Sequence, residues 1–187
     1  QANLADVVAR LNAVMEVDAG IREYVGVPVY HSFGYGRCRA VLAAGGQCYL
    51  PETRFDLKEI RALLLAGEIN AISAVPSLWR VFLQSVSLFG DELERVRWIE
   101  IGSQYMPVAE KQALRRACPN ARIVQHYGLT EASRSTLLRI DRTPDAALES
   151  VGRAEGDVGV RLDGDGRVEI RGPHVAMGVG DGTEDRA

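Results

Sequence analysis

The stretch Ala71-Ile-Ser-Ala-Val-Pro-Ser-Leu-Trp-Arg-Val-Phe82 joins a short run of small and apolar residues to a helical pattern. Residues 71–75 read as a buried strand, and Pro76 closes it because proline has no N–H to donate to a sheet. The residues that follow, 77–87, have the spacing of an amphipathic helix. The stretch therefore predicts a strand that leads directly into a helix.

The same order of strand and helix extends in both directions from this stretch. Each predicted strand is short and apolar, and each is followed by a segment with helical spacing. Such repeats imply an α/β fold, with a parallel sheet covered by helices on both faces. The predicted strands lie at residues 26–30, 47–50, 71–75, 98–101 and 122–126, and the helices at 4–15, 35–44, 56–66, 77–87 and 107–118, with Asp56 as an N-cap.

Beyond about Arg139 the apolar period changes to two. Residues 158–162 and 168–170 alternate around the turn Asp163-Gly-Asp-Gly166, which predicts an antiparallel hairpin. A calcium loop would need further oxygen donors after this turn, and the sequence does not supply them. We therefore predict an α/β subdomain over residues 1–139 and a smaller β-rich segment over 140–187.

The composition of the 187 residues excludes several classes of protein. The net charge is -3 and no block of Lys and Arg occurs, so nucleic acid is not an expected partner. Apolar stretches end well before the roughly 20 residues that span a bilayer, and residues 1–10 do not resemble a secretory signal. Cys38, Cys48 and Cys118 are odd in number and fit reduced thiols. We expect a soluble, cytoplasmic protein.

Polar residues follow several of the predicted strands, where ligands bind in open α/β sheets. They lie at 31–34, 76–77, 102–104 and 127–131. In the last group, Tyr127 suits a purine face and Gly128 allows close approach of the backbone. Thr130 can donate to a phosphate oxygen, and Glu131 can hold Mg²⁺. A plain turn with a capping Thr130 is the structural alternative.

Residues 124–131, Val-Gln-His-Tyr-Gly-Leu-Thr-Glu, resemble the Tyr-Gly-x-Thr-Glu motif of the adenylate-forming superfamily. This superfamily contains acyl- and aryl-CoA synthetases, adenylation domains of peptide synthetases, and luciferases. The order and spacing of further segments agree with it over nearly the whole chain. These segments are His31-Ser-Phe-Gly34, Ala74-Val-Pro-Ser-Leu78, Ile101-Gly-Ser-Gln104, Ser150-Val-Gly-Arg153 and Val168-Glu-Ile-Arg-Gly-Pro173.

The resemblance implies an enzyme that joins a carboxylate to the α-phosphate of ATP, releases pyrophosphate and passes the acyl group to CoA or a carrier protein. The implied cofactors are ATP or AMP, Mg²⁺ and CoA. The implied roles are the adenine site for Gly102, Ser103 and Gln104, ring contact for Tyr127, the AMP phosphate for Thr130, Mg²⁺ for Glu131, and the carboxylate pocket for His31, Ser77 and Gly128. Thr130, Glu131 and His31 would carry the chemistry.

The sequence also departs from the family pattern. No glycine-rich phosphate loop with its lysine precedes Asn3, the ribose-binding Asp motif is not recognisable in residues 179–187, and the C-terminal domain with its lysine is missing. Ser103 stands where glycine is usual, and Tyr105 where proline is usual. We therefore expect a central piece of the large N-terminal domain of such an enzyme, inactive in isolation.

Two readings compete with this one. A degenerate module that binds an acyl group, an adenylate or a partner protein without turnover would also lack the phosphate loop. A dinucleotide fingerprint, Gly34-x-Gly36-x-x-Arg39, is weaker because its third glycine is Arg39. For the substrate, residues 31–34 offer no Asp to pair with an ammonium group, so an aryl or fatty acid is expected rather than an amino acid. His126 and His174 are interpreted as ordinary polar residues.

Overall fold

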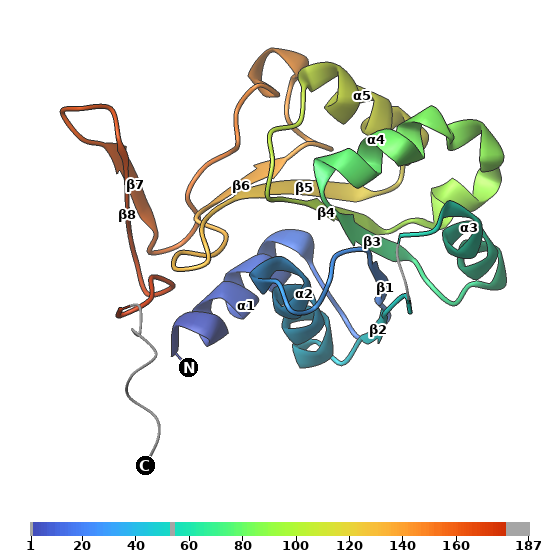
Figure 1. Ribbon diagram of the computed structural model, residues 1–187, viewed down its shortest axis with the longest axis horizontal. Helices are drawn as coiled ribbons and strands as arrows, with labels where there is room; N and C mark the ends of the chain where they lie inside the picture. Colours follow the sequence, from blue (N-terminus) through green and yellow to red (C-terminus); the bar gives the residue numbers. More distant parts are fainter. Residues whose placement is uncertain (1, 53–54, 179–187) are drawn as a thin grey trace.

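The computed structural model describes residues 2–52 and 55–178. Within them, one sheet has the strand order β2-β1-β3-β4-β5-β6 (Figure 1). The strands are β1 (Arg22–Val25), β2 (Gln47–Tyr49), β3 (Ala71–Ala74), β4 (Trp98–Ile101), β5 (Arg122–Tyr127), β6 (Thr136–Arg139), β7 (Gly159–Leu162) and β8 (Val168–Arg171). The main helices are α1 (Ala2–Met15), α2 (Ser32–Ala43), α3 (Leu57–Ala66), α4 (Pro76–Gln84) and α5 (Val108–Ala117).

The sheet is parallel from β2 through β5, and β6 pairs antiparallel with β5 at one edge. The predicted parallel sheet is therefore confirmed, with one antiparallel strand that the sequence pattern did not indicate. β6 follows β5 through the short loop that contains the Tyr127–Glu131 motif. Such a short connection can only return the chain antiparallel, because a parallel return needs a crossover.

Helices cover both faces of the sheet, as predicted (Figure 1). Along each strand, alternate side chains face opposite layers. Ile72, Ile99 and Ile123 belong to the core under α3, α4 and α5, which includes Trp79 and Phe82. The opposite face packs against α1 and α2 through a second core, formed by Leu11, Met15, Ile21, Ala40, Val41, Ala71, Trp98, Val124 and Leu137.

The prediction of a strand over residues 26–30 is wrong, because the first strand is β1 at Arg22–Val25. Glu23 is fully buried in this strand, and its charge hid the strand from a reading based on apolar runs. Gly26 still donates its N–H to the carbonyl of Ser73, at 2.8 Å. After that bond the chain leaves the sheet, since Pro28 has no N–H to donate.

The predicted N-cap of α3 is confirmed. The carboxylate of Asp56 accepts hydrogen bonds from the backbone N–H groups of Lys58 and Glu59, at 2.8 and 3.3 Å. Gly67 ends the helix in the left-handed conformation, with φ of 72°. These two caps fix the length of α3, and so the point at which the chain enters β3.

The predicted hairpin is also confirmed. β7 and β8 form a separate two-stranded antiparallel sheet that projects away from the helical layers (Figure 1). The segment between β6 and this hairpin packs on the main sheet, where Ile140 and Leu148 are fully buried in the larger core. The division of the chain at residues 139 and 140 stays a prediction. Among the described residues, no helix has the length and apolar character needed to cross a bilayer.

Candidate functional site

A cavity of about 280 Å³ opens at the carboxyl ends of β4 and β5. Four segments build it: the first turn of α2, the residue pair after β4, the end of β5, and the loop between β5 and β6. Its position agrees with the rule that open α/β sheets bind ligands beyond the carboxyl ends of their strands. The lining residues are Ser32, Phe33, Ser103, His126, Gly128, Leu129, Thr130, Ser133 and Arg134.

Three of the predicted site residues, Ser103, Gly128 and Thr130, line this cavity together. The other predicted residues lie around it or apart from it. Gln104 and Glu131 are exposed next to lining residues, Tyr127 is half-buried at the end of β5, and Gly102 is buried. His31 is exposed at the N-cap position of α2, and Ser77 is exposed in the first turn of α4. Neither of these two lines the cavity, so their predicted roles rest on the resemblance alone.

The loop after β5 makes a tight turn that requires glycine at residue 128. A β-carbon there would sit 2.5 Å from the backbone nitrogen of Arg134 and 2.7 Å from the carbonyl oxygen of Ala132. Leu129 and Ala132 exchange backbone hydrogen bonds of 3.1 and 3.2 Å across the turn. This turn holds the exposed Thr130 and Glu131 at its tip.

Ser103 has an unusual backbone conformation, with φ of 76°. This is the left-handed region, which glycine adopts freely and which costs other residues energy. The departure from the family glycine at this position therefore places a strained serine in the wall of the cavity. Strain of this kind persists only where the surroundings hold the residue in place.

A buried ionic cluster lies beneath the cavity, centred on Glu100 of β4. Its carboxylate contacts the guanidinium groups of Arg37 and Arg134, each at 2.8 Å, and Nδ1 of His126 at 2.7 Å. Arg37 also binds Glu23 through two parallel contacts of 3.0 Å. Burial raises the pKa of the Glu100 carboxyl, but the charges of Arg134, Arg37 and His126 outweigh it and hold that pKa well below its usual value.

This cluster ties together the segments that carry the cavity. Arg37 comes from α2, Glu100 from β4, His126 from β5 and Arg134 from the following loop. The sequence contained one signal for it, because a glutamate within the otherwise apolar run Trp-Ile-Glu-Ile of residues 98–101 is unusual in a buried strand. Which cations would surround Glu100 could not be predicted, since its partners are distant in sequence.

The interpretation of His126 and His174 as ordinary polar residues needs revision, because both rings have specific partners. His174 is buried, and its Nε2 lies 3.0 Å from the hydroxyl oxygen of Ser135. That hydroxyl donates to the carbonyl of Ala132 at 2.8 Å. Nearby, the N–H of Ala176 donates to the carbonyl of Glu131 at 2.7 Å. The segment around His174 therefore braces the loop that presents Thr130 and Glu131.

The donor set of the site suits a magnesium ion whose coordination shell comes largely from a bound nucleotide and water. Among the described residues no cluster of three or more His, Cys, Asp or Glu side chains could hold a metal by itself. Glu131 supplies one exposed carboxylate, and Mg²⁺ bound with a nucleotide needs only one or two carboxylates, because phosphate oxygens and water complete its shell.

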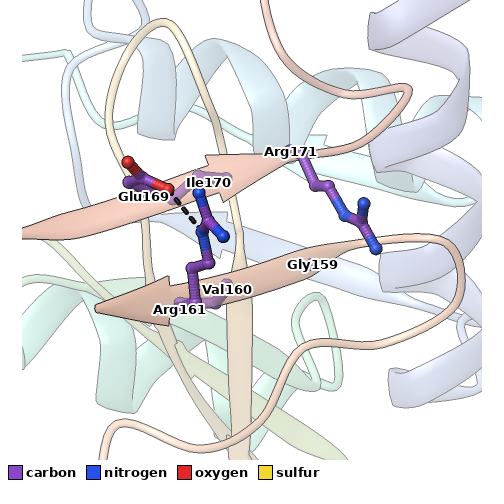
Figure 2. A pocket seen from close by; sticks show the side chains of 6 residues that line it. All are labelled: Gly159, Val160, Arg161, Glu169, Ile170 and Arg171. Carbon is purple, nitrogen blue, oxygen red and sulfur yellow. Dashed lines mark hydrogen bonds and ion pairs between the residues drawn. The ribbon is translucent and has the colours of Figure 1, made fainter. Parts of the chain in front are cut away.

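A second hollow lies on the hairpin and contains none of the predicted site residues. Figure 2 shows its lining, in which Arg161 of β7 is paired with Glu169 of β8, and Arg171 lies beside Gly159. The side chain of Arg161 is 78% exposed, so this ion pair contributes little to stability. The hollow is the groove of an exposed two-stranded ribbon, and the cavity above Glu100 is the better candidate site.

The three cysteines are free. Although Cys38 and Cys48 are distant in sequence, α2 and β2 place them against the same small apolar cluster. The neighbouring thiol of Cys48 lowers the pKa of Cys38 to about 7. Cys118 follows the last residue of α5 and is buried in the larger core, and this burial raises its pKa to about 12.

Comparison with known proteins defines the class of this chain. The model of the AMP-binding enzyme family matches residues 2–179. The chain therefore belongs to the AMP-binding enzyme family, in agreement with the resemblance to adenylate-forming enzymes. The glycines Gly34 and Gly36 of the alternative dinucleotide fingerprint lie inside α2 and not in a turn before it.

Two curated relatives are similar along most of the chain. A propanoyl:CoA ligase from Rhodococcus jostii, whose acid carries a methyl-dioxo-octahydroindenyl group, is 26% identical over 160 residues, 86% of this chain and 31% of the relative. A 2-succinylbenzoate–CoA ligase from Listeria monocytogenes is 27% identical over 154 residues, 81% of this chain and 32% of the relative. The chain thus spans about a third of the length of these relatives.

The fold matches that of a solved enzyme. The o-succinylbenzoate coenzyme A synthetase of Bacillus subtilis, in complex with ATP and magnesium, superposes with a TM-score of 0.81 over 95% of this chain and 38% of that protein. Sequence identity in this superposition is 19%. The agreement establishes the adenylate-forming fold for this chain.

Proposed function

We propose that this chain is the nucleotide- and acyl-binding part of an ATP-dependent carboxylate-activating enzyme. In the proposed reaction, a carboxylate oxygen attacks the α-phosphorus of ATP, and the bond from that phosphorus to the pyrophosphate oxygen breaks. A thiol, that of CoA or of a carrier protein, then attacks the acyl carbon, forms a thioester and releases AMP. Both ligase relatives join acids to CoA by name, which supports CoA as the acceptor.

The observation that carries this proposal is the convergence of Ser103, Gly128 and Thr130 on one cavity in a chain of this family. In the proposed arrangement, the segment Gly102–Gln104 lies along the adenine and Tyr127 lies against its ring. Thr130 donates a hydrogen bond from its hydroxyl to the α-phosphate, because negative charge develops there in the transition state. Glu131 holds Mg²⁺, which offsets the phosphate charge when it is bound.

The acid is proposed to be an aryl or fatty acid. The lining of the cavity includes Arg134 and contains no carboxylate, so an α-ammonium group would be left without a counter-charge. His31 and Ser77 are assigned to the border of the acyl pocket by resemblance. A cytoplasmic setting, as expected from the reduced thiols, is part of the same proposal.

Exchange of radiolabelled pyrophosphate into ATP tests the proposed function in the longer protein that carries this chain. We expect exchange that depends on an added carboxylic acid, and a loss of orders of magnitude in Glu131→Gln, because a metal ligand acts mainly on the transition state. Binding of the acid should change little. Equal exchange by wild type and Glu131→Gln over a Mg²⁺ titration would contradict the role of Glu131.

The same assay addresses the activity of the 187-residue chain by itself. Its sequence has no glycine-rich loop with a lysine to bind the leaving phosphates, so we expect no exchange from it. Robust exchange by the isolated chain would contradict this part of the proposal. If a longer protein that contains this chain binds an adenylate but also shows no exchange, the alternative of a module that binds without turnover is favoured.

A further inference from the structure

Cys38 and Cys48 come from different elements that pack on each other. Cys38 lies in α2, and Cys48 lies in β2 at the edge of the main sheet. Both side chains pack against one small apolar cluster, formed by Val25, Val27 and Phe33. Both cysteines are also partly exposed, so a small reagent can reach them from solvent.

The register of the sheet shows that Cys48 points toward α2. In the parallel pair of β1 and β2, Cys48 lies opposite Glu23. Partners in such a pair direct their side chains to the same face of the sheet. The carboxylate of Glu23 binds Arg37 of α2. The next pair, Tyr24 and Tyr49, stacks on the other face, with ring centroids 5.5 Å apart. The thiol of Cys48 therefore lies on the face that α2 covers.

The ion pair of Arg37 and Glu23 brings the two thiols together. Cys38 follows Arg37 in the helix, and Cys48 is the strand neighbour of Glu23, so the contact of 3.0 Å between the charged groups sets one cysteine beside the other.

This neighbourhood makes one of the thiols reactive. The thiol of Cys48 lowers the pKa of Cys38 to about 7, and the charge of Arg37 acts in the same direction against burial and Glu23. The same pairing raises the pKa of Cys48. At neutral pH Cys38 therefore supplies a thiolate, the form of cysteine that attacks as a nucleophile.

We propose that Cys38 and Cys48 form a site of reversible oxidation, at which hydrogen peroxide converts the two thiols into a disulfide between α2 and β2. The thiolate of Cys38 attacks one peroxide oxygen, the O–O bond breaks, hydroxide leaves and a sulfenic acid forms. The sulfur of Cys48 then attacks the sulfenic sulfur, the S–O bond breaks, and the oxygen leaves as water with the proton of Cys48. The two sulfurs lose two electrons in total, and the peroxide is reduced to two water molecules.

The disulfide ties α2 to the edge of the sheet. This helix carries Phe33, which lines the candidate cavity, and Arg37, which binds Glu100 beneath it. The site is independent of the proposed activity. Cys118 packs in the larger core on the opposite face of the sheet, where burial raises its pKa. It therefore serves as an internal reference that a mild oxidant leaves unchanged.

Peroxide treatment of the reduced 187-residue chain tests the site. The dose is the lowest that oxidises free cysteine in a parallel sample. We expect the intact chain to lose about 2 Da, the mass of the two hydrogen atoms removed, and Cys118 to stay open to N-ethylmaleimide in denaturant. Since trypsin cleaves after Arg39, the disulfide appears as residues 38–39 linked to residues 40–54. Dithiothreitol should restore all three thiols.

Serine variants separate the attacking thiol from the one that resolves the sulfenic acid. Cys38→Ser should leave Cys48 reduced at this dose, because no thiolate remains to attack the peroxide. Cys48→Ser should stop at the sulfenic acid of Cys38, which dimedone traps. Cys118→Ser is the control and should form the disulfide as wild type does. Oxidation spread evenly over the three cysteines, disulfides found only between chains, or equal oxidation of Cys48 in Cys38→Ser would overturn the proposal.

The pH dependence of alkylation tests the pairing without an oxidant. The rate at which iodoacetamide modifies Cys38 in the reduced wild type should reach half its maximum at a pH of about 7. Cys48→Ser should move this midpoint upward, toward that of an ordinary free cysteine, because the neighbouring thiol is gone. The same midpoint in wild type and Cys48→Ser would contradict the pairing of the two thiols.

Discussion

The imidazole of His126 lies over the α-carbon of Gly102, so closely that a β-carbon at residue 102 would sit 2.0 Å from Cε1 and 2.3 Å from Nε2. This contact joins the segment after β4 to the end of strand β5. Both segments carry residues assigned to the nucleotide. The ring of His126 lies between them and therefore sets their spacing. The glycine that the family pattern places here is therefore required by a neighbour within this chain.

Gly102→Ala should destabilise the protein, because the methyl group cannot fit unless the ring of His126 moves and breaks its contact with Glu100. We expect a loss of about 1 to 3 kcal/mol in the free energy of unfolding in urea. His126→Gly should relieve the clash, so that the double variant loses less than the sum of the single changes. Gly164→Ala, in the hairpin turn with no atom within 4 Å of the added carbon, is the control and should change stability little.

Ser103→Gly should stabilise the fold or leave it unchanged, although most substitutions by glycine destabilise. The left-handed φ of 76° costs serine energy that glycine does not incur. Since glycine also gains entropy in the unfolded chain, we expect a net gain of about 1 kcal/mol or less. Ser85→Gly, at a residue with φ of -115°, should show no gain. A clear loss of stability in Ser103→Gly would show that the serine hydroxyl makes a stabilising contact.

Neutralisation of Glu100 should cost much more stability than neutralisation of Glu23, although both are fully buried and both contact Arg37. Burial raises the pKa of Glu23 above its usual value, whereas Arg134, Arg37 and His126 overcome burial and lower that of Glu100. Glu100→Gln should therefore cost about 3 kcal/mol at pH 7, and Glu23→Gln much less. Urea unfolding of the two variants checks this, and equal losses would contradict it.

The contribution of Glu100 to stability should also depend on pH. Because its folded pKa is lower than its unfolded one, the contribution is present above pH 4.5 and is lost as the pH falls below that value. Wild type should lose stability in acid more steeply than Glu100→Gln. Parallel curves for the two proteins from pH 6 to pH 3 would count against the ionised state of Glu100.

The buried His174 should make stability fall as the pH drops through the range below 6.5. Burial lowers its pKa, so the unfolded chain binds the proton more readily than the folded one, and stability rises with pH across this window. We expect the difference in unfolding free energy between pH 7.5 and pH 5.5 to shrink in His174→Gln. His31→Gln, at an exposed position, should keep the wild-type difference. If His174→Gln keeps it as well, the account of His174 is wrong.

The sequence predicted the alternation of strands and helices because short apolar runs and helical spacing are local signals. It failed at β1, where the charge of Glu23 conceals a buried strand, and it missed β6, which no change of period marks. Glu23 reads as a surface residue until Arg37, fourteen positions later, is placed beside it. Local patterns do not report a partner that only the fold brings close.

The residues of the candidate site also fall into those that local sequence signals identified and those that they missed. Ser103, Gly128 and Thr130 were identified from strand ends and from a family motif, and the fold gathers them around one cavity. Phe33, His126 and Arg134 were not identified, although they line the same cavity. Glu100, which belongs to no motif, contacts His126 and Arg134, and Phe33 packs against the ring of His126.

A heteronuclear NMR titration of the 187-residue chain with a non-hydrolysable acyl-adenylate tests the central claim most directly. We expect saturable shifts of the backbone signals of Ser103, Gly128 and Thr130, and their loss or weakening in Thr130→Ala but not in Thr143→Ala, a threonine in the turn after β6. Shifts confined to the hairpin of β7 and β8, with the signals of Ser103, Gly128 and Thr130 unchanged at saturation, would contradict the assignment of this cavity.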